Sequence, residues 1–318
     1  MFGKKSNKNL QSSLTLGFLL ILFCQVFICY GFNSTPMVNA PPGTVVGFEE
    51  SKFPMTVVNS SNPCLVAPGL YDEFAEQLEN HSYIIDTLDV GQSINQTELE
   101  RFDILVMIAP FNSYTAQEIN EIDLWVKNGG SLLIITEWDI YGDGLRNLTN
   151  HFGFNYPHQD GLRDSDDAVG NTLQFYIDSA NIATHDITSG INRIEIYGAT
   201  GLNESAAGSV TLIDTDDNST TEWNKGGLAN DIPVLSALEG GSLEKGKLVI
   251  ITDSNIWDNG EDIDSDGLLD FYDSDNAALA LNIINWLSVP YTPTAPLDIF
   301  SIISLFTLFV FIIYKKRK

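Results

Sequence analysis

Residues 102–136 read FDILVMIAPFNSYTAQEINEIDLWVKNGGSLLIIT and predict a strand, a helix and a second strand. The apolar runs 103–108 and 131–136 are continuous, which is typical of strands buried on both faces of a sheet. The segment between them has the periodicity of a helix over 116–127, and a Gly-Gly pair ends it. Strand–helix–strand order with short loops predicts parallel neighbouring strands covered by helices.

The expected helix carries its own start signal and one apolar face. Thr115 precedes it, and Glu118 follows three residues later, so the two side chains have the spacing of a capping box. The apolar positions that share one face are Ile119, Ile122, Trp125 and Val126. This face is expected to pack against the sheet.

Further strand and helix signals alternate on both sides of this unit. Strands are expected at 44–48, 83–88, 195–197, 210–213, 234–238 and 247–252. Helices are expected at 70–78, 96–101, 144–152 and 276–287. This alternation predicts an α/β domain with a mostly parallel sheet.

Five segments together resemble a known superfamily. They are FDILVMIAP (102–110), NGGSLLII (128–135), HDITSGI (185–191), KLVIITDSN (247–255) and NIINWL (282–287). This set resembles the class I glutamine amidotransferase-like superfamily, in particular its non-catalytic branches in ThuA-like and GldG-type surface or transport-associated proteins. The resemblance covers roughly residues 44–288 and implies a flavodoxin-like three-layer sandwich.

Catalytic members of that superfamily carry a Cys on a tight turn after a buried strand, with a His-Glu pair downstream. Such a nucleophile needs a base within hydrogen-bond reach. Here the expected strand 131–136 runs into Glu137-Trp138-Asp139, with neither Cys nor Ser at the turn. Cys64 lies in a proline-flanked loop before the first expected helix. The sequence therefore predicts no catalytic residue of this kind.

Residues 262–273 read DIDSDGLLDFYD and have the spacing of a calcium loop. Calcium takes roughly six to eight hard oxygen ligands, which alternating carboxylates and one backbone carbonyl supply on a loop turned by a central Gly. The expected ligands are Asp262, Asp264, Asp266, the carbonyl of Leu268, Asp270 and Asp273. The loop resembles dockerin and thrombospondin-type calcium loops, although its last position is Asp instead of the usual bidentate Glu. The alternative is a solvated acidic loop.

Two other polar groups have weaker patterns. The first lacks the Gly and is interpreted as an ordinary loop: Asp214, Asp216, Asn218 and Glu222. The second follows two expected strands, at the edge where open α/β sheets bind ligands: Glu137, Asp139, Asp143, Asp253, Asn255 and Asp258. Joined by His151, His158 or His185, the second group could form a metal-dependent hydrolase. The alternative is that these residues cap helices and turns.

Two apolar segments with basic outer flanks enclose almost all of the acidic residues. Residues 33–296 hold 41 of the 42 Asp and Glu but nine of the 16 Lys and Arg, a net charge of −32. Segments 14–32 and 297–314 are each about long enough to cross a bilayer core, which takes roughly 20 residues. Because cationic flanks stay cytoplasmic, we expect a cell-membrane protein with an extracytoplasmic main domain and a cytoplasmic C-terminus.

This pattern divides the chain into six expected parts. They are a signal peptide or an N-terminal membrane anchor (1–32), a linker (33–43), the extracytoplasmic domain (44–290), a second linker (291–296), a transmembrane helix (297–314) and a basic tail (315–318). The domain and its first linker also contain sequons that fit an external, glycosylated surface: Asn33, Asn59, Asn80, Asn95, Asn147, Asn203 and Asn218.

The strong negative charge disfavours nucleic acid as a partner. We expect a membrane-anchored, extracytoplasmic binding domain without a catalytic nucleophile, stabilised by calcium. The composition favours an archaeal-type envelope, and the partner is expected to be an envelope glycan, peptide or protein. Two alternatives remain open: a metal-dependent hydrolase that uses the strand-end carboxylates, and an accessory subunit of an ABC-type transporter.

Overall fold

The computed structural model describes part of the chain. The described residues are 41–52, 54, 56–57, 67–68, 71–138, 140–157, 159–169, 171–203, 206–221, 230–258 and 269–292. The chain divides into two units, Met1–Asn39 and Ala40–Lys318, and the described residues all belong to the second. Among them, no helix combines the length and the apolar character that a membrane crossing requires. The two expected membrane segments, 14–32 and 297–314, lie outside the described residues.

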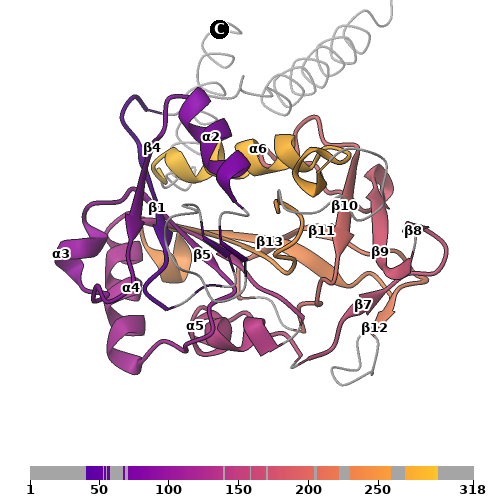
Figure 1. The fold of residues 1–318 in the computed structure, drawn as a ribbon, viewed down its shortest axis with the longest axis horizontal. Helices are drawn as coiled ribbons and strands as arrows, with labels where there is room; N and C mark the ends of the chain where they lie inside the picture. Colours follow the sequence, from indigo (N-terminus) through magenta and orange to yellow (C-terminus); the bar gives the residue numbers. More distant parts are fainter. Residues whose placement is uncertain are drawn as a thin grey trace, which may run out of the picture. The chain divides into compact units, whose positions relative to one another are not determined.

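A seven-stranded sheet forms the centre of the domain (Figure 1). Its strands, in spatial order, are β11 (Val210–Asp214), β13 (Pro233–Glu239), β14 (Lys247–Ile251), β6 (Ser131–Ile135), β5 (Ile104–Ile108), β1 (Val45–Glu49) and β4 (Ile84–Leu88). The five strands from β14 to β4 pair in parallel, whereas β13 pairs antiparallel with both of its neighbours, β14 and β11. The mostly parallel α/β sheet predicted from the sequence is therefore confirmed.

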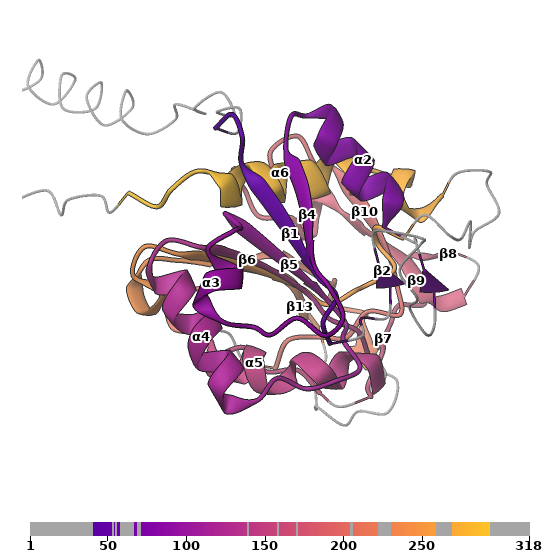
Figure 2. The same ribbon diagram turned by 60° about the vertical axis from the view of Figure 1, so that its left-hand side comes forward.

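Helices cover both faces of this sheet (Figures 1 and 2). One layer consists of α2 (Asp72–Asn80) and α6 (Asn276–Ser288), and the other of α3 (Gln96–Leu99), α4 (Ala116–Lys127) and α5 (Arg146–His151). Successive side chains of a strand point to opposite faces. Leu133 and Ile135 of β6 accordingly join the core under α2 and α6, while Leu132 and Ile134 join the core under α4 and α5. The predicted sandwich of three layers is confirmed.

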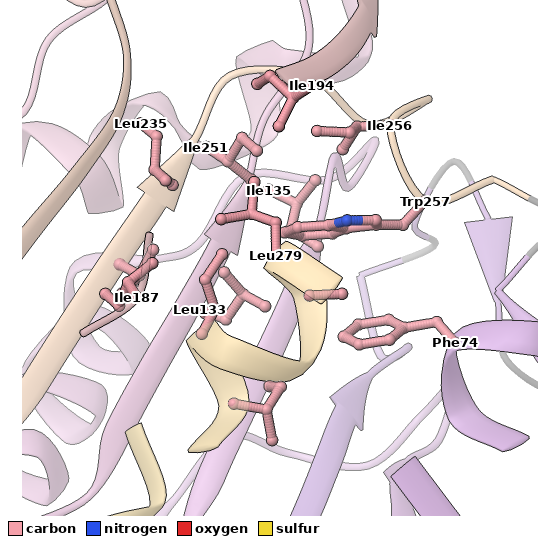
Figure 3. Close-up of a cluster of buried hydrophobic side chains, with 14 of the residues drawn as sticks. Phe74, Leu133, Ile135, Ile187, Ile194, Leu235, Ile251, Ile256, Trp257 and Leu279 are labelled. Atoms are coloured by element: carbon pink, nitrogen blue, oxygen red, sulfur yellow. The ribbon is translucent and has the colours of Figure 1, made fainter. Parts of the chain in front are cut away.

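The core under α2 and α6 contains more buried residues than the core on the other face of the sheet. Figure 3 shows part of it. Trp257 is fully buried in it, and its ring centroid lies 5.5 Å from that of Phe74. The indole Nε1 donates a hydrogen bond of 2.9 Å to the backbone carbonyl of Asn276, at the start of α6. Trp257 therefore connects the loop after β14 to both helices of this layer.

The capping box predicted for α4 is present. The Thr115 hydroxyl accepts a hydrogen bond from the Glu118 N–H at 3.3 Å, and Glu118 Oε2 accepts one from the Thr115 N–H at 2.8 Å. These contacts satisfy two backbone donors that the first turn of a helix leaves open.

We expect Thr115→Ala to lower the free energy of unfolding by about 1 kcal/mol, because the hydroxyl acceptor at the helix start is lost. Urea denaturation of the variant and the parent chain measures the loss. Thr115→Ser keeps the hydroxyl and should restore most of the stability. An equal loss in both variants would contradict a capping role.

A second, smaller sheet was not predicted. It contains β8 (Ala168–Val169), β9 (Asn171–Asp178) and β10 (Arg193–Tyr197), paired antiparallel. The expected strand 195–197 belongs to it, but β9 carries polar side chains and was missed. The remaining short elements are β2 (Thr56–Val57), β3 (Ala67–Pro68), β7 (Leu162–Arg163), β12 (Thr220–Thr221) and the 3₁₀ helices η1 (Ile140–Leu145), η2 (Ser179–Asn181), η3 (Gly241–Leu243) and η4 (Asp270–Tyr272).

Candidate functional site

The carboxyl ends of the parallel strands carry buried acidic side chains. Glu49 is the last residue of β1, Glu137 lies two residues after β6, and Asp253 two residues after β14. All three are almost completely buried. Because the strands are parallel, these ends lie at one edge of the sheet, the edge at which open α/β sheets bind ligands.

Hydrogen bonds within the protein hold Glu137 in place. Its Oε2 accepts from the Ser254 hydroxyl at 2.6 Å, and its Oε1 accepts from the Trp138 N–H at 2.7 Å. The Tyr71 hydroxyl donates to the carbonyl of Ser254 at 2.7 Å. Burial, followed by the charges of neighbouring carboxylates, raises the pKa of Tyr71 well above its ordinary value, so the phenol stays a neutral donor.

Asp253 is fully buried and also accepts hydrogen bonds from the backbone. The Tyr197 N–H donates to Oδ2 at 2.7 Å, and the Asn255 N–H donates to Oδ1 at 2.8 Å. Burial raises the pKa of Asp253 to about 7, since these hydrogen bonds only partly offset the loss of water. This carboxyl therefore changes charge near neutral pH.

Glu49 occupies a similar environment on β1. Its side chain accepts hydrogen bonds from the Tyr114 hydroxyl at 2.6 Å and from the Ser51 hydroxyl. Burial raises the pKa of Glu49 above its ordinary value. Each strand-end carboxylate thus already serves as an internal hydrogen-bond acceptor.

The turn after β5 has the backbone conformation that a reactive side chain could use. Ala109 follows the strand with a φ of 29°, in the left-handed region that residues other than Gly rarely adopt. Its methyl group offers no nucleophile or proton donor. After β6, where the sequence comparison with amidotransferases suggested the turn, Glu137 is buried and hydrogen-bonded.

The described histidines contact other parts of the fold. His151 on α5 lies 3.3 Å from Asp123 of α4, and the ring of His185 packs against Trp286 of α6 at 5.6 Å. His81 contacts the carbonyl of Gln77 at 2.7 Å. Within the described part of the chain, no histidine therefore joins the strand-end carboxylates. His158 and Asp139 lie outside the described residues.

A different acidic cluster lies beside the smaller sheet. Asp164, Asp167 and Asp216 bring carboxylate oxygens within 4.8 Å of one another. Asp164 Oδ2 accepts from the Ser219 hydroxyl at 2.7 Å, and its Oδ1 accepts from the Asp167 N–H at 3.0 Å. Burial raises the pKa of Asp164, but these hydrogen bonds outweigh it and hold the pKa below its ordinary value. These hydrogen bonds are those of a turn, and Asp216 belongs to the set that the sequence predicts to be an ordinary loop.

The predicted calcium loop is described only in its last part. Asp262, Asp264, Asp266 and Leu268 lie outside the described residues. Asp270 and Asp273 are 6% and 3% exposed and line a cavity of about 10 Å³. The same cavity is lined by Gln174 of β9, by Glu195 and Tyr197 of β10, and by Asn255, Asn276, Ile196 and Ile256.

Hydrogen bonds fix the walls of this cavity. Gln174 Nε2 donates to Glu195 Oε1 at 2.7 Å, across the β9–β10 pair. The side chain of Asn276 accepts from the Glu195 N–H at 3.1 Å and donates to the carbonyls of Glu195 and Asp270 at 3.0 and 3.1 Å. Asn276 thus ties the start of α6 to the smaller sheet and to the end of the loop.

Sequence reasoning missed Gln174, Glu195, Ser254 and Tyr71. Each of them meets its partner across a long stretch of chain, for example Ser254 with Glu137. A local signal existed only for Ser254, which sits between Asp253 and Asn255 after an expected strand.

Comparisons with solved structures and with protein families found similar folds and one matching family. The chain is similar to the mmIFT52 N-terminal domain, with a TM-score of 0.59, 13% identity and coverage of 79% of this chain and 100% of that domain. It is also similar to a putative ThuA-like protein from Bacteroides uniformis (TM-score 0.43, 10% identity, coverage 80% and 95%) and to one from Parabacteroides merdae (0.43, 10%, 81% and 94%). At these identities the likeness concerns the fold alone.

No curated protein matches the sequence. One family profile does, and it matches residues 70–284, which is more than half of the chain and includes α2, the parallel core of the sheet from β5 onward, and most of α6. The chain therefore belongs to the family described as a domain of unknown function (DUF4350).

Proposed function

We propose that this chain is a membrane-anchored, extracytoplasmic binding domain that uses no nucleophile and is stabilised by calcium. The observation that carries the proposal is that the acidic side chains at the carboxyl ends of the parallel strands are buried and hydrogen-bonded. Glu49, Glu137 and Asp253 are buried there, and each accepts hydrogen bonds from within the protein. A catalytic carboxylate has to reach a substrate, whereas these hold the loops of the edge in place.

The left-handed turn at Ala109 supports the same reading. The turn at Ala109 presents only a methyl group, and the turn after β6, where the resemblance places the catalytic nucleophile, carries Glu137. The described histidines contact α2, α4 and α6. We infer that the edge provides a rigid recognition surface formed by the loops after β1, β5, β6 and β14.

Charge and chain organisation support an external location. The acidic residues lie between the two apolar segments 14–32 and 297–314, whose outer flanks are basic. A surface of this charge favours cations and high-salt solubility and disfavours nucleic acid. The partner we propose is a glycan, a peptide or a protein of an archaeal-type envelope.

Calcium is proposed for the loop 262–273, through Asp262, Asp264, Asp266, the carbonyl of Leu268, Asp270 and Asp273. Its support is that the last two carboxylates are buried beside Glu195. Buried carboxylate oxygens that lie close together are favourable ligands for a divalent ion.

We expect calcium to raise the melting temperature of the full chain, kept in detergent, relative to the same protein in EDTA. At 100 times the dissociation constant the gain in unfolding free energy is about 2.7 kcal/mol. Differential scanning calorimetry measures it. The Asp264→Ala/Asp266→Ala variant should lose the response, and an unchanged wild-type melting curve, or an equal rise in the variant, would exclude calcium binding by the loop.

The binding function has a separate test. Tagged full chain in detergent is incubated with solubilised envelope glycans and proteins, with calcium and with EDTA, and the retained components are identified. A Glu137→Gln variant is the matched control, because it keeps the shape of the edge but changes its charge. Retention of one component by the wild type and its loss in EDTA supports the proposal; turnover of a captured component would overturn the non-catalytic interpretation.

A further inference from the structure

A small polar cavity joins the smaller sheet to the end of the acidic loop. Its volume is about 10 Å³, which is the space of one water molecule or one bare cation. Three carboxylates lie in its lining, from Glu195, Asp270 and Asp273. None of the described residues that line it is cationic.

Gln174 indicates, independently of the carboxylates, that the cavity holds a ligand. It is 2% exposed and lines the cavity, and its Nε2 donates to Glu195 Oε1 at 2.7 Å. The Gln174 Oε1 atom is buried and has no hydrogen-bond partner among the described residues. A buried amide oxygen without a partner destabilises the folded state, so an occupant that accepts its lone pairs is favoured.

The chemistry of the lining selects the occupant. Carboxylate and amide oxygens are hard ligands, which suit calcium or magnesium and disfavour zinc or copper. Magnesium keeps several of its waters, for which a cavity of this volume has no room. Calcium accepts irregular sets of protein oxygens and is therefore the better fit.

We propose that this cavity binds calcium through Gln174 Oε1 and the carboxylates of Asp270 and Asp273. Glu195 is a positioning residue, because it holds the Gln174 amide by accepting its N–H. Among the described residues, the three carboxylates of this cavity do not all bring an oxygen within 4.8 Å of the others. We therefore assign two carboxylates and one amide to the ion. The proposal rests on the calcium dependence proposed above and deepens it: the ion ties the loop end to β9.

The charge of the lining favours a cation. Three carboxylates line the cavity, a divalent ion offsets most of their negative charge, and the amide oxygen adds a ligand without further charge. The backbone of the site is fixed by Asn276, whose side chain bonds to the carbonyls of Glu195 and Asp270. The ion therefore links two segments that are already held in register.

The test uses the full chain in detergent, with calcium and terbium as probes. Terbium bound in the cavity lies against Tyr197, so excitation of that ring should produce sensitised emission that calcium displaces. We expect Gln174→Met and Asp273→Asn to weaken calcium binding at least about tenfold. Gln174→Glu supplies a charged oxygen and should keep calcium binding while melting at a lower temperature in EDTA, because it places a second carboxylate beside Glu195.

Asn282→Leu is the matched control, since Asn282 is a buried amide of α6 that donates to the carbonyl of Ser189 and does not line the cavity. It should lower the melting temperature and leave calcium affinity unchanged. If the wild type binds calcium, and Asp264→Ala/Asp266→Ala abolishes binding while Gln174→Met does not, the cavity assignment is overturned and the loop proposal stands. If the wild type gives neither a calcium response nor terbium emission, the cavity holds water only, and both proposals are overturned.

Discussion

Replacing Trp257 by alanine is expected to lower the free energy of unfolding by about 3–5 kcal/mol. The side chain is 0% exposed and fills the space between Phe74 of α2 and the start of α6. Its removal leaves a cavity under both helices of this layer and takes away the donor to the Asn276 carbonyl. The loss should therefore exceed that of any single surface change.

Urea denaturation followed by circular dichroism measures this loss. Trp257→Phe retains part of the packing and lacks the indole N–H, so it should cost less than the alanine variant. A loss below about 1 kcal/mol for Trp257→Ala would be within the range of ordinary substitutions and would contradict the central place of this side chain in the core.

The stability of the domain is expected to fall as the pH rises from about 4 to 7, because Asp253 binds a proton more tightly in the folded state. Its pKa is raised from 3.8 to about 7 by burial. A group with a raised folded-state pKa favours the folded protein most strongly when both states are protonated, and this advantage disappears as the pH passes through the folded pKa. The full change corresponds to about 4 kcal/mol at 1.36 kcal/mol per pKa unit.

Denaturation curves at a series of pH values between 4 and 8 test this expectation. Burial also raises the pKa of Glu49, which adds a slope of the same sign. Asp253→Asn removes only the contribution of Asp253, so the variant should show a shallower dependence on pH than the parent chain. Parallel curves for the two proteins would show that Asp253 does not titrate in this window.

The central part of the fold could be predicted because its signals are local. The apolar run 103–108 predicts a strand and the capping box at Thr115 predicts a helix start. The observed β5 and α4 agree with these positions. The strand β9 (NTLQFYID) could not be predicted in the same way. Its buried positions, among them Gln174 and Phe175, take their environment from β10 and from the core instead of from an apolar run.

The residues of the candidate sites also differ in whether a local sequence signal predicts them. Spacing alone selected Asp270 and Asp273, and both prove to line one cavity. Gln174 lies about 100 residues earlier in the chain, and only the pairing of β9 with β10 and the placement of η4 bring it there. The buried state of Glu137 was likewise invisible in the sequence, since it depends on Ser254 of a distant strand end.

Equilibrium dialysis of the detergent-solubilised full chain against radioactive calcium measures whether the domain binds this ion. We expect saturable binding by the wild type that is weakened in Asp273→Asn, whose residue belongs both to the loop and to the cavity, and that persists in the Asn282→Leu control. Absence of saturable calcium binding by the wild type would contradict a calcium-stabilised domain. Equal binding by Asp273→Asn and the wild type would contradict it as well.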